Sequence, residues 1–374
     1  MPSSRRKAWG VWLSVHKPFQ ATVNTAPEAG RHRAVVFGAA GTALTAEERA
    51  FFRDADPLGF ILFRRNCETP DQLRALVDAM RESVGRADAP VLIDQEGGRV
   101  ARMRPPHWPS FPPMRAFGDL AGRDAEAGRE AAWINARLLA HMLLDVGVTV
   151  DCAPVCDVPV EGAHDIIGDR AFSRDPACVA GLARATCEGL MAGGVLPVIK
   201  HIPGHGRAFT DSHAELPVVD APREALEATD FAPFRELADM PLGMVAHVVL
   251  KAIDPDAPAS TSATVVREVV RGAPIGFDGL LFSDDLSMGA LAGDMTSRAK
   301  AVLAAGLDVV LHCNGVMEEM VDVAEAVPPM GDAAARRWGR ARSACGAARP
   351  AAVGEPDIGA LRARLAELLG TPLV

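Results

Sequence analysis

The sequence predicts an α/β fold, a (β/α)8 TIM-type barrel that forms a single catalytic domain. Short apolar runs alternate with helix-like segments along most of the chain, starting at Ala34. About eight of these runs are apolar throughout, which is typical of parallel strands covered on both faces. Eight strand–helix units are the number that closes such a barrel. An open doubly wound sheet is the main alternative, but the stretch 38–41 (GAAG) lacks the spacing of a phosphate-binding fingerprint.

The predicted strands are short, and several are followed closely by a polar residue. Their apolar side chains would fill the inside of the barrel and contact the surrounding helices. In chain order they are residues 34–37, 59–63, 91–93, 148–150, 195–199, 243–248, 280–282 and 307–311.

Capping residues mark the starts of several helices. Thr45 and Glu48 have the spacing of a capping box. Thr69 and Asp175 each precede a proline, the residue preferred at the first position of a helix. The predicted helices cover residues 45–53, 69–84, 126–144, 175–191, 223–237, 263–271 and 297–305, and further helices after about residue 315 are expected to pack outside the barrel.

Composition narrows the class of protein. The chain has 374 residues, of which 49% are hydrophobic and 23% charged, so a large core is possible. The formal net charge of −9 argues against a nucleic-acid surface. No apolar run reaches the roughly 18 residues of a membrane span, so no membrane contact is expected.

Seven cysteines are spread along the chain without a paired framework, which indicates a reducing compartment. We therefore predict a cytoplasmic protein, and we expect a monomer. Cys152 and Cys156 lack the spacing of a metal or redox pair and are interpreted as buried free thiols.

Three segments are predicted. Residues 1–32 form an N-terminal extension that is expected to be poorly ordered, and we interpret it as an extension rather than a signal peptide. Residues 33–345 form the barrel. Residues 346–374 form a C-terminal tail or helix that packs on the barrel.

Polar residues collect at the ends of predicted strands. Because the carboxyl ends of barrel strands share one mouth, we expect these side chains to converge there. They are Asp94, Asp157, Lys200, His201, His247 and Asp284.

Several of these residues also have a structural interpretation. Asp94 could cap a helix, and His247 could be a core histidine whose hydrogen bonds are satisfied. Asp284 and Asp285 are adjacent, so in extended backbone they point to opposite faces and only one serves the site. Arg170 could pair with Asp169 or reach a ligand.

The stretch 200–206 (KHIPGHG) and the nearby 211–213 (DSH) hold the densest group of reactive side chains. His201, His205, His213 and Asp211 could bind zinc. However, the proline and glycines of the stretch disfavour the helix that brings a histidine pair together, so no metal is expected. His205, between two glycines, could simply hydrogen-bond its own loop.

The motifs resemble those of family 3 glycoside hydrolases, specifically the single-domain bacterial β-N-acetylhexosaminidases of peptidoglycan recycling. The resemblance spans roughly residues 35–314, and it departs from the family only in small ways, such as Ile202 in place of phenylalanine and Thr261 after Pro258. The matching stretches, in the family's order, are 94–100 (DQEGGRV), 167–170 (IGDR), 200–206 (KHIPGHG), 211–213 (DSH) and 282–288 (FSDDLSM).

The resemblance implies a function and a role for each motif. It implies Asp284 as the nucleophile of a retaining exo-β-N-acetylglucosaminidase and His213, with Asp211 as its partner, as the acid/base. The substrate would be a muropeptide, GlcNAc-anhydroMurNAc, cut without metal or organic cofactor. An imidazole titrates near pH 6.5, so it can give a proton and then take one. The implied sugar-binding residues are Asp94, Arg102, Arg170, Lys200 and His201.

Four alternatives remain open from the sequence. A β-glucosidase is the nearest, although its acid/base would be expected from another domain. Transfer of the sugar to phosphate instead of water is the second, because a neutral imidazole repels an anion less than a carboxylate does. A carbohydrate-binding barrel without activity and a metal-dependent hydrolase are the others.

Overall fold

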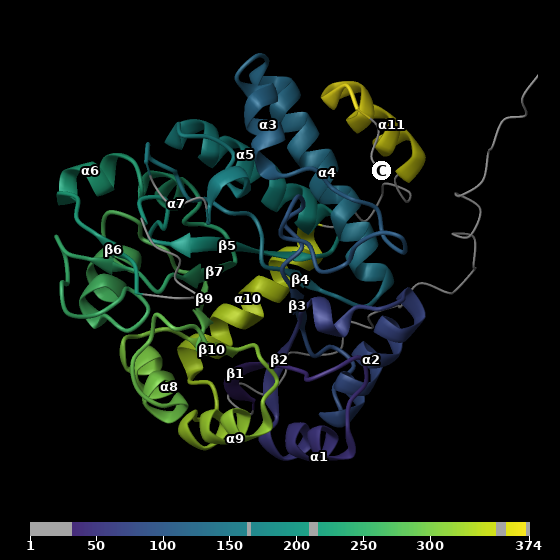
Figure 1. The fold of residues 1–374 in the computed structure, drawn as a ribbon, viewed down its shortest axis with the longest axis vertical. Helices are drawn as coiled ribbons and strands as arrows, with labels where there is room; N and C mark the ends of the chain where they lie inside the picture. The colour runs from purple at the N-terminus through teal and green to yellow at the C-terminus, as the bar shows by residue number, and fades with distance from the viewer. Residues whose placement is uncertain (1–31, 163–165, 209–215, 349–356, 372–374) are drawn as a thin grey trace, which may run out of the picture.

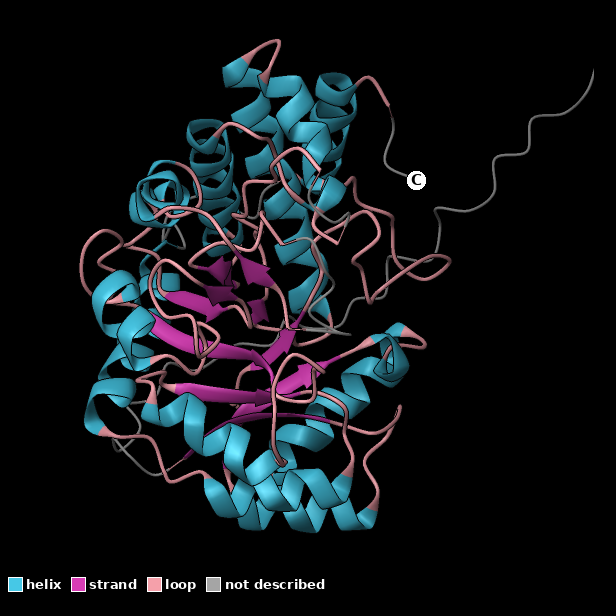
Figure 2. Cartoon of the chain, turned by 60° about the vertical axis from the view of Figure 1, so that its left-hand side comes forward, coloured by secondary structure: helices cyan, strands magenta, loops and turns pink. Residues whose placement is uncertain are grey.

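The computed structural model describes residues 32–162, 166–208, 216–348 and 357–371. Within these ranges, eight parallel strands close into a barrel in the order β1-β10-β9-β7-β5-β4-β3-β2, and helices surround it (Figures 1 and 2). The predicted (β/α)8 barrel is therefore confirmed. The barrel strands are β1 (Arg33–Gly38), β2 (Pro57–Leu62), β3 (Val91–Ile93), β4 (Val150–Asp151), β5 (Leu196–Ile202), β7 (Leu242–Val245), β9 (Leu280–Asp285) and β10 (Val309–His312).

The other elements lie outside the barrel wall. A separate two-stranded sheet pairs β6 (Val218–Val219) with β8 (Val249–Leu250). In the described part of the chain the α-helices are α1 (Ala46–Ala55), α2 (Pro70–Ser83), α3 (Met114–Ala121), α4 (Ala125–Asp145), α5 (Pro176–Ala192), α6 (Arg223–Ala228), α7 (Ala232–Glu236), α8 (Met295–Ala304), α9 (Met317–Ala326), α10 (Asp332–Ala348) and α11 (Ile358–Leu369). Three single-turn or irregular helices are η1 (Arg64–Asn66), η2 (Gly168–Arg170) and the π-helix η3 (Val265–Val270).

The helix starts predicted at Thr45, Thr69 and Asp175 are confirmed by their caps. The Thr45 hydroxyl accepts a hydrogen bond from the Glu48 N–H at 3.0 Å, and the Glu48 carboxylate accepts one from the Thr45 N–H at 2.8 Å. Thr69 and Asp175 also accept hydrogen bonds from the first turns of α2 and α5. Each cap satisfies an N–H group that the helix itself leaves without a partner.

One predicted helix is wrong. Residues 223–237 form two short helices, α6 and α7, instead of one. Pro233 has no N–H to continue the helical ladder. The Thr229 hydroxyl lies 2.7 Å from the Ala225 carbonyl oxygen and 2.6 Å from the Asp230 carboxylate, two acceptors that compete for its single proton. A proline and side chains that compete for backbone partners together end the first helix.

The core is formed by the barrel strands and the inner faces of the helices. All six residues of β2 and all seven of β5 are buried. Phe52 of α1 packs on Phe60 of β2 with ring centroids 5.1 Å apart. Cys152 and Cys156 are buried free thiols, as the sequence indicates. Within the described residues, no helix is long and apolar enough to cross a membrane.

The C-terminal helices contact the barrel from outside. In α10, Arg337 binds Asp308, which lies just before β10 and therefore at the amino end of the strands. In α11, Arg364 binds Glu130 of α4. The segment boundaries predicted at residues 32 and 345 stay predictions, although α10 continues through the second one to Ala348.

Candidate active site

A cavity of about 310 Å³ opens where the barrel strands end. Its wall is built by residues at or after the carboxyl ends of β2, β3, β5, β7, β9 and β10, as expected for a barrel mouth. Asp211 and His213 lie outside the described residues. The other predicted site residues all line the cavity: Asp94, Arg102, Arg170, Lys200, His201 and Asp284.

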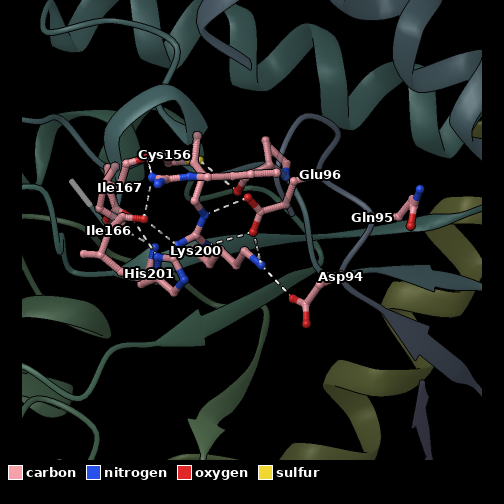
Figure 3. A network of polar contacts seen from close by, with 12 residues as sticks. Asp94, Gln95, Glu96, Cys156, Ile166, Ile167, Lys200 and His201 are labelled. Atoms are coloured by element: carbon pink, nitrogen blue, oxygen red, sulfur yellow. Dashed lines mark hydrogen bonds and ion pairs between the residues drawn. The ribbon is translucent and has the colours of Figure 1, made fainter. Parts of the chain in front are cut away.

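A buried lysine links two carboxylates in the cavity wall. Figure 3 shows the Lys200 side chain between Asp94 and Glu96. Its Nζ lies 2.7 Å from Asp94 Oδ1 and 2.7 Å from Glu96 Oε1. Arg102 binds the other oxygen of Asp94 at 3.0 Å. Arg170 holds Glu96 through two parallel bonds, both 2.8 Å long. The result is a row of alternating charges from Arg102 to Arg170.

These pairs keep the row ionised. Burial acts to raise the pKa of Asp94, but Lys200 and Arg102 outweigh it and hold that pKa below its usual range. Burial is likewise outweighed at Glu96, where Arg170 and Lys200 lower the pKa to about 2. Burial acts to lower the pKa of Lys200, but the two carboxylates raise it above its usual value. Ionised side chains form stronger hydrogen bonds to hydroxyl groups than neutral ones do.

Glu96 is a site residue that the sequence analysis missed. It lies two residues after Asp94, in the stretch 94–100, whose resemblance to the family implied no role for Glu96. The position of Glu96, close to an aspartate at the end of a strand, could have indicated a site residue. Nothing in the sequence shows that Arg170 is the partner of Glu96. Asp169, the partner considered for Arg170, instead forms an ion pair with Arg99 at 3.0 Å.

The segment that carries Arg170 packs against α3 at Gly118. A Cβ atom at this position would lie 1.7 Å from the Phe172 carbonyl oxygen, so backbone would have to move. We expect Gly118→Ala to lower the free energy of unfolding by about 1–3 kcal/mol, because overpacking forces such shifts. Urea unfolding followed by circular dichroism measures the change.

Gly181 in α5 is the matched control, since a Cβ there would meet nothing within 4 Å. We expect Gly181→Ala to leave stability unchanged or raise it by about 0.5–1 kcal/mol, because alanine is the better helix former. If both variants lost the same amount of stability, the contact with Phe172 would not be the cause of the effect at Gly118.

Asp157 fixes the stretch that follows β5. Its fully buried carboxylate accepts from His201 Nδ1 at 2.6 Å, from the His205 N–H at 2.7 Å and from the His201 N–H at 3.3 Å. Burial acts to raise the pKa of Asp157, but the two histidines outweigh it and lower that pKa. Because an ionised carboxylate can only accept, this contact places a proton on His201 Nδ1 and fixes the orientation of the ring.

Lys200 and His201 both line the cavity, although neighbours on a regular strand point to opposite faces. The pairing register between β5 and β7 shifts between Ile199 and Ile202. This irregularity at the end of β5 turns consecutive side chains toward the same space.

The two aspartates at the end of β9 both border the cavity, although alternation in extended backbone predicts opposite faces, and they differ in their hydrogen bonds. Asp284 lines the cavity, and its carboxylate accepts from the Asp285 N–H at 2.9 Å. Burial acts to raise the pKa of Asp284, but the imidazoles of His201 and His247 outweigh it and lower that pKa. The Asp285 carboxylate also borders the cavity but binds Ser287 and the Cys313 N–H. Asp284 is therefore the ionised group available for chemistry.

His247 is a core residue with both ring nitrogens satisfied. Nδ1 lies 2.7 Å from the Ser260 hydroxyl, and Nε2 lies 3.0 Å from the Asp285 carbonyl oxygen. Burial lowers the pKa of His247. A carbonyl oxygen can only accept, so Nε2 carries a proton and donates to it. Of the two interpretations left open by the sequence, the structural one describes His247, which supports the end of β9.

No group of three or more metal-ligating side chains is found among the residues that the structure describes. Asp211 and His213, two of the zinc ligands considered from the sequence, lie outside those residues.

Known proteins are similar to this chain over most of its length. Residues 33–336 match the family described as the glycosyl hydrolase family 3 N terminal domain. A protein of Alkalilimnicola ehrlichii named Beta-hexosaminidase is 43% identical over 287 residues, which cover 75% of this chain and 80% of that protein. A Beta-hexosaminidase of Bordetella avium is 39% identical over 306 residues, covering 80% and 86%.

A solved structure is similar over nearly the whole chain. The NagZ of Neisseria gonorrhoeae, crystallised with N-trifluoroacetyl-D-glucosamine, is 34% identical with a TM-score of 0.79, covering 92% of this chain and 99% of that one. A barrel with ionised carboxylates in its mouth and these relatives define an enzyme, a glycoside hydrolase. The chain belongs to glycosyl hydrolase family 3, and the curated relatives named here are beta-hexosaminidases.

Proposed function

We propose that this enzyme is a retaining exo-β-N-acetylglucosaminidase. It removes terminal, non-reducing β-linked N-acetylglucosamine from muropeptides such as GlcNAc-anhydroMurNAc during peptidoglycan recycling, as a cytoplasmic monomer. Two similarities support the sugar preference: the relatives named Beta-hexosaminidase, and the NagZ that was crystallised with an N-acylated glucosamine.

The observation that carries the proposal is the ionised Asp284 in a cavity lined by paired charges. An ionised carboxylate beside the anomeric carbon can attack it and form a glycosyl ester. Asp94, Arg102 and Lys200 then hold sugar hydroxyls, the carboxylate as acceptor and the cations as donors. Such contacts position the ring and strengthen as positive charge develops in the transition state.

The proposed reaction has two steps, formation of a glycosyl ester and its hydrolysis. In the first, an Asp284 oxygen bonds to the anomeric carbon, the glycosidic bond breaks, and the leaving oxygen takes a proton from His213. In the second, His213 takes a proton from water, the water oxygen bonds to the anomeric carbon, and the ester bond to Asp284 breaks. Asp211 would orient the His213 ring; both roles are implied by the family resemblance.

Turnover of aryl β-N-acetylglucosaminide and of GlcNAc-anhydroMurNAc tests this function. Free N-acetylglucosamine with retained β-configuration at the moment of release is the expected product. Faster turnover of an aryl β-glucoside would contradict the sugar preference. Accumulation of N-acetylglucosamine 1-phosphate in phosphate buffer would contradict hydrolysis.

The role of His213 gives a separate prediction. His213→Ala should slow substrates with poor leaving groups by about 10²–10⁴-fold, because these need a proton as the bond breaks. Formation of the glycosyl ester from an activated dinitrophenyl glycoside should change far less, as stopped-flow release of dinitrophenol measures. Equal losses on both substrates would remove His213 from the acid role.

A further inference from the structure

His205 lies in the cavity wall, and the mechanism proposed above assigns no role to its side chain. The residue is only 4% exposed, yet it lines the same cavity as Asp284. Within the described part of the chain, neither of its ring nitrogens has a hydrogen-bond partner. The described part of its loop, residues 202–208, offers the ring no hydrogen-bond partner. A buried imidazole without partners costs about 1–3 kcal/mol for each unsatisfied group, so its presence calls for a ligand.

The loop does not need the ring to hold its shape. The backbone N–H of His205 donates to Asp157, and its carbonyl oxygen accepts from the Ala208 N–H. Gly206 packs so closely on the Val158 backbone that a Cβ would lie 2.1 Å from the Val158 carbonyl oxygen. Backbone contacts thus fix this part of the loop, and among the described residues no hydrogen bond occupies the ring.

The ring is neutral and lies close to the reacting groups. Burial lowers the pKa of His205 to about 4, and the charges of Asp157, Asp284 and Arg170 also act on it. The ring centroid lies 5.8 Å from that of His201. A neutral imidazole offers one N–H donor and one acceptor nitrogen, whereas Asp94, Glu96, Lys200 and the other members of the charged row are ionised.

The chemistry of the substrate suggests the partner. In N-acetylglucosamine, the carbon next to the anomeric carbon carries an acetamide, which is a neutral donor and acceptor. Asp284 attacks the anomeric carbon in the proposed reaction, so groups beside Asp284 lie near that acetamide. We propose that the His205 imidazole hydrogen-bonds the 2-acetamido group and so favours N-acetylhexosamines over sugars with a hydroxyl there. This inference rests on the proposed function.

The test compares two substrates in two variants. His205→Phe keeps the ring volume without hydrogen-bonding atoms, and His205→Asn keeps a smaller donor and acceptor. We expect His205→Phe to lower kcat/KM for aryl β-N-acetylglucosaminide by about tenfold or more, because a buried polar group of the substrate loses its partner. The value for aryl β-glucoside should change less than about threefold, and His205→Asn should lie between wild type and His205→Phe. Inhibition constants of free N-acetylglucosamine and glucose should follow the same pattern.

His107, exposed on a surface loop and absent from the cavity wall, supplies the control variant His107→Phe. If His205→Phe lowered kcat/KM equally for both substrates, or for neither, the proposed role of His205 would be overturned. If His205→Phe does not fold, an unchanged substrate ratio in His205→Asn overturns it. Failure of the proposed function is a different result, because the wild-type enzyme would then not hydrolyse aryl β-N-acetylglucosaminide.

Discussion

Replacing Asp284 with asparagine should abolish hydrolysis of aryl β-N-acetylglucosaminide, with a loss in kcat of about 10⁴-fold or more. Removing an enzyme nucleophile has effects of this size, because the covalent route is lost and the remaining groups act only by binding. The measurement is steady-state release of the aryl group, with enough enzyme to detect about 10⁻⁵ of the wild-type rate.

The fold should survive this substitution. The Asp284 side chain accepts from the Asp285 N–H, and the carboxamide oxygen of asparagine can accept the same bond. Urea midpoints of variant and wild type should therefore agree closely. Trapping the wild type with a fluorinated N-acetylglucosamine analogue should label Asp284. Near-normal turnover in the variant, or a label on another residue, would defeat the assignment.

Replacing Lys200 with methionine should have the largest effect on stability. The substitution leaves the buried Glu96 close to the mostly buried Asp94, and among the described residues each carboxylate keeps one arginine as ion-pair partner. Breaking a buried ion pair from one side costs about 3–5 kcal/mol. Because an arginine remains on each carboxylate, we expect the free energy of unfolding to fall by about 3 kcal/mol, the lower end of this range. Urea unfolding measures the change. Activity should also fall, since a donor to the sugar is lost.

Lys251→Met is the matched control, because Lys251 pairs with Asp220 on the surface. Exposed pairs contribute about 0–1 kcal/mol, so its stability should be close to that of the wild type. If both variants lost a similar amount of stability, the location of Lys200 between Asp94 and Glu96 would not be the cause of its effect.

The Lys200 effect should depend on pH in a defined direction. The pKa of Glu96 falls from 4.5 to about 2 on folding, so its ion pairs stabilise the protein above about pH 4.5 and are lost as the pH falls toward 2. Without Lys200, Asp94 and Glu96 bind protons at higher pH in the folded state. The stability difference between wild type and Lys200→Met should therefore shrink as the pH falls from about 4.5 toward 2. A constant difference would contradict a charge-based cause.

The barrel could be predicted from the sequence because its signals are local. The strands are apolar throughout, so their number and order are visible as runs such as the one that became β5 (Leu196–Ile202). The caps at Thr45 and Thr69 satisfy N–H groups only three residues away, so spacing alone revealed two helix starts. The convergence of Asp94, Lys200 and Asp284 followed from one rule, that parallel strands end at the same mouth.

The partners inside the cavity could not be predicted in the same way. Lys200 and Asp94 are 106 residues apart, and Arg170 and Glu96 are 74 apart. No sequence spacing encodes such pairs, because they depend on how the loops after different strands fold back over the mouth. For the same reason Glu96 was missed, and His205 was interpreted as a loop residue.

The sequence by itself therefore determined the kind of fold, the positions of its strands and the end of the barrel that carries the polar residues. These features follow from short-range patterns of burial and capping. Only the tertiary structure decided which carboxylate each cation holds, that Asp157 orients His201, and that the His205 ring is left without a partner among the described residues. Those outcomes depend on distances of a few ångströms between loops that are far apart in the chain.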